Sequence, residues 1–291
     1  MSGTRTSRFV WLAQNPQSVS VYQRRLTRLR VSPHFERLTE PMGEVFEGKD
    51  LSEAMFWGVD LQGSYFRDTN LSNSRFFHTF WNDVSVDGVI NRLVVNGVDV
   101  TDYVNTHDRW YPLRTQLEPA TADELRSVWS TLQSHWSDLL SHVAQLEPEV
   151  ALQSVNGEWS LRDTLRHLLF AMDKWFFVPI LDPILDSERV STLDKQSYTS
   201  IGLPNTESQD LDWPGIDRHA DPSFDDVLRI HSERYELFTQ FIKTLRFDDL
   251  PDSVDVGENG SVPAVMCFYV VLEEEFEHLR YALRDLDLNA T

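Results

Sequence analysis

Cysteine is almost absent from this sequence: Cys267 is the single example among 291 residues. One cysteine excludes an internal disulfide framework and fits a reducing compartment. Long apolar runs are missing too, since none approaches the ~20 residues that a membrane helix needs. Residues 1–10 contain arginines but lack the apolar stretch of a signal peptide. From these absences we expect a cytoplasmic protein with no membrane partner.

Basic residues are few relative to acidic ones. Forty-six acids and 26 bases give a formal net charge of −20 at pH 7. A protein that binds the phosphate backbone of a nucleic acid should be basic, so we expect no nucleic-acid partner. The sequence also lacks a nucleophilic triad, a phosphate-binding loop and a nucleotide fingerprint, so catalytic and cofactor-binding residues are not assigned. The expected partner is a small-molecule substrate of unknown identity, and a homodimer is left open.

The chain length suggests two domains. Residues 1–43 are basic on an otherwise acidic chain and have no sustained apolar period. This composition predicts a poorly ordered arm or one that lies on the acidic body, unless translation starts at Met42. The predicted divisions are the arm at 1–43, a repeat segment at 44–100, a linker at 101–120, a helical domain at 121–286 and a tail at 287–291.

Large apolar residues recur every five positions in the repeat segment. This period fits neither a helix nor a flat strand, and it predicts a coil that turns a corner every five residues. The registered residues are Phe46, Leu51, Phe56, Leu61, Phe66, Leu71, Phe76, Trp81 and Val86. The pattern resembles the pentapeptide-repeat family. That resemblance implies a short right-handed quadrilateral β-helix of about two to three coils with Phe56 to Phe76 inside, which needs a neighbour to cap it.

The rest of the chain is predicted to be helical after one hairpin. Asn96-Gly97 between valines predicts a β-turn. Capping boxes and apolar residues at spacings of three and four then predict four amphipathic helices. These helices cover about residues 121–143, 160–177, 223–245 and 263–283, with a long connection at 183–222. The expected fold class is α+β in separate domains, a short β-helix followed by a four-helix bundle.

Three residues are candidate metal ligands. His167 lies in a nearly apolar helix, where an unpaired imidazole is costly, so its partner should come from another helix. Glu274 and His278 are four residues apart and project from one helix face. Such a pair can chelate a cation, and a third ligand from a facing helix would complete a facial triad. A simple Glu274–His278 ion pair is the alternative. Asp173 is expected to be an exposed helix residue, with a contact to a ligand imidazole as the alternative, and His231 is expected to be a packing histidine rather than a ligand.

Two sequence motifs around these residues resemble those of DinB-like metal-binding bundles. The stretch EWSLRDTLRHL at 158–168 resembles their second-helix motif, and Glu274-x-x-x-His278 with the following LRYALRDL resembles their fourth-helix motif. The Asn96–Val100 stretch resembles the joint in actinobacterial proteins that fuse pentapeptide repeats to such a bundle. The resemblance extends over about residues 44–286.

The DinB-like resemblance implies a set of ligands. Many such proteins bind zinc, nickel or iron through one histidine on helix two and an His-x-x-x-His pair on helix four. By that resemblance His167 and His278 are ligands, and Glu274 replaces the first histidine of the pair. Two histidines and one carboxylate suit Zn(II) or non-haem Fe(II). The expected cofactor is therefore a divalent metal (zinc, nickel or iron), and the bundle's relatives imply a low-molecular-weight thiol beside it.

Three functions are compatible with the sequence. Relatives of the bundle include transferases and isomerases that use small thiols such as mycothiol or bacillithiol, so the resemblance implies a metal-dependent transferase. Some pentapeptide-repeat proteins resemble DNA and bind DNA-handling enzymes, which implies instead a non-catalytic scaffold that acts through its repeat surface. The third hypothesis is a bundle that has lost catalysis and keeps a structural or sensing role. Metal analysis tests the first of them, because the transferase mechanism needs the ion.

Overall fold

The computed structural model describes residues 44–46, 48–66, 69–155, 158–183, 198–205 and 211–286. The predicted arm at 1–43 and the tail at 287–291 lie outside these residues. The described chain divides into two compact units, one ending at Arg109 and the other beginning at Trp110. Among the described residues, no helix has both the length and the apolar character to span a membrane.

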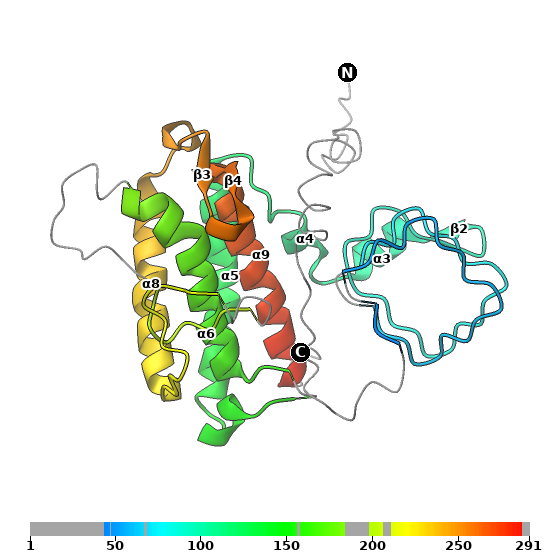
Figure 1. Ribbon diagram of the computed structural model, residues 1–291, viewed down its shortest axis with the longest axis horizontal. Helices are drawn as coiled ribbons and strands as arrows, with labels where there is room; N and C mark the ends of the chain where they lie inside the picture. The colour runs from blue at the N-terminus through cyan, green and yellow to red at the C-terminus, as the bar shows by residue number, and fades with distance from the viewer. Residues whose placement is uncertain are drawn as a thin grey trace. The chain divides into compact units, whose positions relative to one another are not determined.

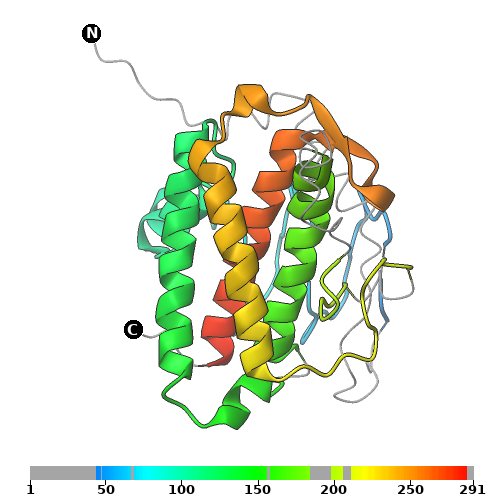
Figure 2. The same cartoon turned by 90° about the vertical axis from the view of Figure 1, so that its left-hand side faces the viewer.

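The second unit is mostly helical, as predicted. Its long helices are α5 (Ala122–Val143), α6 (Leu161–Met172), α8 (Phe224–Thr244) and α9 (Ala264–Asp285). Helices α5 and α6 each pack against both α8 and α9, so the four close into a bundle (Figure 2). Shorter elements connect them: α4 (Tyr111–Arg114), η1 (Pro148–Leu152), η2 (Asp173–Leu181), η4 (Phe247–Asp249), β3 (Ser253–Asp255), η5 (Gly257–Asn259) and β4 (Ser261–Pro263).

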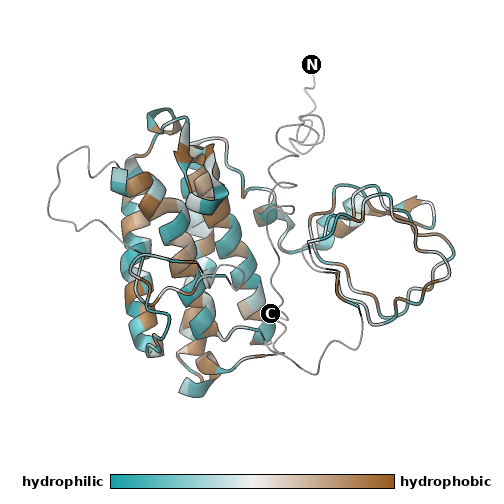
Figure 3. Ribbon diagram, viewed as in Figure 1, coloured by the Kyte–Doolittle hydropathy of each residue, from teal (hydrophilic) through white to brown (hydrophobic). Residues whose placement is uncertain are grey.

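Polar caps and apolar faces explain where these helices form. Thr121, Ser160 and Ser223 each accept the backbone N–H three residues ahead, which satisfies a donor that the first turn leaves open. Each helix is apolar on one face and polar on another (Figure 3). The apolar faces meet in the core, where Trp129 and Phe176 are almost fully buried.

Helix α6 is buried nearly all round and continues directly into η2, which is π-helical. The sequence predicted one helix over 160–177 and gave no sign of the wider turn. Pro179 lies inside η2 and has no N–H to donate, so regular α-helical bonding fails there. π-Helical turns are often found at functional sites.

The first unit does not form the predicted β-helix. Among the described residues of this unit, the strands are β1 (Val94–Val95) and β2 (Val98–Asp99), which pair antiparallel. Their turn, Asn96-Gly97, has positive φ at both residues and confirms the predicted hairpin. The unit ends with helix α3 (Thr101–His107), so α3 and α4 both lie where the sequence predicted a linker.

The reason for the missing β-helix lies in packing. Positive φ recurs at five-residue intervals, at Gly48, Glu53, Gly58, Gly63, Asn73, His78, Asp83 and Gly88. The chain therefore turns at the predicted spacing and winds as an open coil (Figure 1). However, the large side chains predicted inside stay 44–58% exposed, at Phe56, Leu61, Phe66, Leu71 and Phe76. A coil this short gives few side chains a neighbour above and below, so no core or strand ladder forms.

Candidate metal centre

The structure brings the three predicted ligands together. Helix α6 contributes His167 and the adjacent helix α9 contributes Glu274 and His278. The Oε2 atom of Glu274 lies 3.5 Å from Nε2 of His167 and 3.5 Å from Nδ1 of His278. One potential ligand atom from each residue lies within 4.8 Å of the other two. Within the described part of the chain, these three form the cluster of histidine and acidic side chains that could hold a metal ion.

Backbone carbonyls determine which nitrogen of each imidazole carries the proton. Nδ1 of His167 lies 3.0 Å from the Leu203 carbonyl oxygen, and Nδ1 of His278 lies 2.8 Å from the Glu274 carbonyl oxygen. A carbonyl oxygen only accepts, so both Nδ1 atoms are the protonated ones. In the neutral rings, Nε2 then carries the lone pair that a metal ion needs. Hydrogen bonds of this kind usually orient the histidine ligands of metal sites.

The electrostatics of the cluster favour a cation. The Nε2 lone pair of neutral His167 faces the Glu274 carboxylate at 3.5 Å. The side chain of His167 is 4% exposed, and those of Glu274 and His278 are 14% and 15% exposed. Two electron-rich atoms in a poorly solvated place repel each other. Either a proton on Nε2 or a divalent cation removes that repulsion, so the donor set fits a metal ion.

Aromatic rings surround the imidazoles. The Trp159 ring lies 4.7 Å from the His167 ring and 6.3 Å from the His278 ring, centroid to centroid. The Phe170 ring lies 6.2 Å from the His167 ring, and the Tyr281 ring lies 5.9 Å from the His278 ring, centroid to centroid. These apolar faces limit the access of water to the cluster, which strengthens charge interactions within it.

A small cavity lies next to Trp159, the residue whose ring faces His167. Its volume is about 40 Å³, which admits a group the size of a water molecule or a methyl group. The residues that line it include Trp159, Leu161, Thr164, Ala282, Asp285 and Leu286. Trp159 therefore lines the cavity and also faces the His167 imidazole.

The comparisons with known proteins agree with this helical unit. The profile of the DinB superfamily matches residues 131–282, just over half of the chain. The chain belongs to the DinB superfamily. The matched range includes all of α6 and α8, most of α9 and the three clustered residues. The comparison with family profiles provides no support for the predicted pentapeptide-repeat segment at 44–100. No curated protein and no solved structure matches the chain.

Asp173 differs from its predicted role within this DinB superfamily domain. The sequence favoured an exposed helix position, with a contact to a ligand imidazole as the alternative. The structure buries its side chain to 1% exposure, with Arg234 3.4 Å away and the Thr199 N–H donating to Oδ2 at 2.6 Å. Burial raises the pKa of Asp173, although Arg234 and the Thr199 N–H oppose that change. Asp173 therefore anchors the chain near Thr199 rather than an imidazole.

Sequence reasoning missed two contributors to the site. The Leu203 carbonyl comes from the long connection before α8, and a backbone group leaves no signal in residue type. Trp159 was noticed as part of the DinB-like motif but received no role. A tryptophan directly before a capped helix that contains a candidate ligand was the available signal.

A second buried polar cluster lies within the bundle but outside the candidate centre. The Tyr235 hydroxyl donates to Glu275, and the His231 ring stacks on the Tyr235 ring at 3.7 Å. Among the described residues, Nε2 of His231 has no hydrogen-bond partner. Burial raises the pKa of Glu275 and lowers that of His231 to about 3. His231 is thus the buried packing residue that the sequence predicted, although its Nε2 is not satisfied.

Proposed function

We propose that this DinB superfamily protein binds one divalent metal ion through His167, Glu274 and His278 and uses it in a transfer reaction with a small thiol. The observation that carries the proposal is the 3.5 Å approach of His167 Nε2 to the Glu274 carboxylate, with each Nδ1 held by a carbonyl. This arrangement turns the Nε2 lone pair of His167 towards the Glu274 carboxylate, and a ring nitrogen of His278 lies within 4.8 Å of a ligand atom of both residues.

The donor set suits Zn(II) and Fe(II), and Ni(II) also accepts imidazole and carboxylate ligands. Three protein ligands are the number found in catalytic zinc sites, whereas structural sites use four. A divalent ion held in this way lowers the pKa of a bound thiol or water and supplies a nucleophile at neutral pH. Glu274 would offset one of the two positive charges of such an ion, and the Trp159 ring, 4.7 Å from the His167 ring, would limit the access of water to it.

A thiol reactant would have to come from outside the protein. Cys267, the single cysteine of the sequence, is 1% exposed, and burial raises the pKa of its thiol to about 12. A buried, protonated thiol is a poor nucleophile. The resemblance of the 158–168 and 274–286 motifs to DinB-like transferases supports a low-molecular-weight thiol as that reactant.

Metal binding is tested by titrating Zn(II), Ni(II) and Fe(II) into the metal-free protein and measuring the stoichiometry. We expect one ion per chain in the wild type. His167→Ala and Glu274→Gln should weaken binding at least about tenfold. Two matched controls should bind as the wild type does: His142→Ala, an exposed histidine on α5, and Glu273→Gln, the glutamate directly before Glu274. Equal losses in the controls would contradict the assignment of ligands.

The thiol reaction is tested separately on the metal-loaded protein. Mycothiol, bacillithiol and glutathione are offered with a chromogenic electrophile, and thioether formation is followed. We expect one of the thiols to react faster with the wild type than with Glu274→Gln. If the protein binds metal but no thiol reacts above the uncatalysed rate, the metal site stands and the transferase proposal is wrong.

A further inference from the structure

The connection before α8 makes a two-way contact with helix α6 at the candidate centre. The Leu203 N–H donates to the Arg166 carbonyl at 3.1 Å, and the Leu203 carbonyl accepts from Nδ1 of His167 at 3.0 Å. One residue of the connection is thus tied to two successive residues of α6. We call residues 198–205 the strap.

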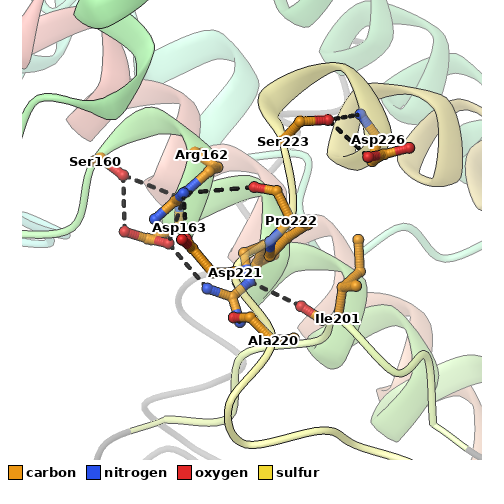
Figure 4. A network of polar contacts seen from close by, with 10 residues as sticks. Ser160, Arg162, Asp163, Ile201, Ala220, Asp221, Pro222, Ser223 and Asp226 are labelled. Carbon is orange, nitrogen blue, oxygen red and sulfur yellow. Dashed lines mark hydrogen bonds and ion pairs between the residues drawn. The ribbon is translucent and has the colours of Figure 1, made fainter.

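Arg166 holds the strap from α6. Its side chain is buried, with Nε donating to the Ile201 carbonyl at 2.9 Å and one terminal nitrogen donating to the Ala220 carbonyl at 3.1 Å. The other terminal nitrogen pairs with Asp163 at 3.2 Å, on the preceding turn of α6. Figure 4 shows these acceptors gathered beside Asp163. The planar fork of a guanidinium holds these three acceptors in a fixed geometry, whereas an ammonium group is a compact charge on a flexible stem.

The other end of the strap is fixed as firmly. The Thr199 N–H donates to the buried Asp173 carboxylate, and the Thr199 hydroxyl accepts from Arg234 of α8 at 2.8 Å. Between the two anchors, the chain passes very close to itself at Gly202. A Cβ added there would lie 3.0 Å from the Thr199 carbonyl oxygen and 3.5 Å from Cβ of Phe170. The position of the Leu203 carbonyl is therefore determined from both sides.

We propose that the strap positions His167 for metal binding by fixing its tautomer, and that Arg166 is the positioning residue that holds it. Without the Leu203 carbonyl, the neutral His167 ring would place its proton on Nε2 and donate directly to Glu274, 3.5 Å away. That tautomer removes the lone pair which the ion needs. The Leu203 carbonyl of the strap instead holds the proton on Nδ1, so that the Nε2 lone pair stays turned towards Glu274. This inference rests on the proposed metal site.

The test compares Arg166→Met with Arg162→Met. Arg162 lies one turn earlier on α6 and also binds the connection, but at Asp221 and the Pro222 carbonyl rather than at the strap (Figure 4). Nitrogen-15 histidine NMR of the metal-free proteins reports which ring nitrogen of His167 carries the proton. We expect the Nδ1–H form in the wild type and in Arg162→Met, and a shift towards Nε2–H in Arg166→Met. Zn(II) affinity, from chelator competition, should fall about 10–100-fold in Arg166→Met alone.

A second variant covers the case in which Arg166→Met fails to fold. Gly202→Ala leaves every hydrogen-bonding side chain in place and should displace the strap through the added methyl group, with the same two effects. If Arg166→Met or, where that variant does not fold, Gly202→Ala keeps both the Nδ1–H tautomer and the wild-type Zn(II) affinity, the inference is wrong. If the wild type binds no Zn(II), the proposed function fails, and the tautomer measurement on metal-free protein still decides what the strap does.

Discussion

Replacing His231 with leucine should make the stability of the bundle less sensitive to acid. Burial lowers the pKa of His231 from its ordinary value of 6.5 to about 3. Between these two values the unfolded chain takes up a proton that the folded chain does not. The free energy of unfolding contributed by this group is therefore complete above pH 6.5 and falls as the pH drops towards about 3.

The size of the effect follows from linkage. Each pH unit below the unfolded pKa reduces stability by ~1.4 kcal/mol, so the loss at about pH 5 is about 2 kcal/mol relative to neutral pH. Leucine cannot titrate and should remove this part of the pH dependence. Its packing against Tyr235 changes stability as well, but by the same amount at both pH values, so only the difference between pH values matters.

Urea unfolding followed by far-UV circular dichroism measures this difference. The signal reports mainly α5, α6, α8 and α9, and a chelator keeps the candidate centre free of metal. On going from neutral pH to about pH 5, the wild type should lose about 2 kcal/mol more than His231→Leu does. His142→Ala, which changes an exposed histidine, should run parallel to the wild type. Parallel curves for wild type and His231→Leu would show that His231 titrates normally in the folded protein, which would refute the reasoning.

Three further results are expected. Ser160→Ala and Ser223→Ala each remove an N-cap and should lower the free energy of unfolding by about 1 kcal/mol in urea titrations, and unchanged stability would contradict the capping contacts. Thr239→Val leaves the buried Trp129 Nε1–H without the hydroxyl to which it donates at 2.8 Å and should lower the free energy of unfolding by about 1–3 kcal/mol, and unchanged stability would contradict that contact. Added Ni(II) should quench the fluorescence of Trp159 because its ring lies 4.7 Å from His167, and Trp159→Phe should abolish most of that quenching.

The helical unit was predictable because its signals are local. Caps such as Ser160 and Ser223 and the apolar spacing behind them fix where a helix begins and which face is buried. The same rules place Glu274 and His278 on one face of α9. Because the helix around His167 is nearly apolar, the partner of this imidazole should come from another helix. The DinB-like resemblance indicates that this helix is the one with Glu274 and His278.

The errors arose where structure depends on distant or cooperative contacts. A five-residue period correctly predicted the turns near Gly58 and Gly63, but a turn spacing does not say whether enough coils stack to bury Phe56 and its companions. The Leu203 carbonyl reaches His167 across 36 residues of sequence, and backbone groups look alike in every residue. Asp173 looked like an exposed acid because its partner Arg234 lies on another helix.

X-ray absorption spectroscopy of the protein loaded with one equivalent of Zn(II) tests the central claim most directly. Multiple scattering from imidazole counts the histidine ligands, and Zn–S and Zn–O/N distances separate a thiolate from a carboxylate, at ~2.3 Å and ~2.0–2.2 Å respectively. We predict two imidazoles and carboxylate oxygen in the wild type, with one imidazole fewer in His167→Ala if any zinc is retained. A spectrum of fully hydrated zinc, or one with no imidazole scattering, would contradict the assignment of His167, Glu274 and His278 as a metal centre.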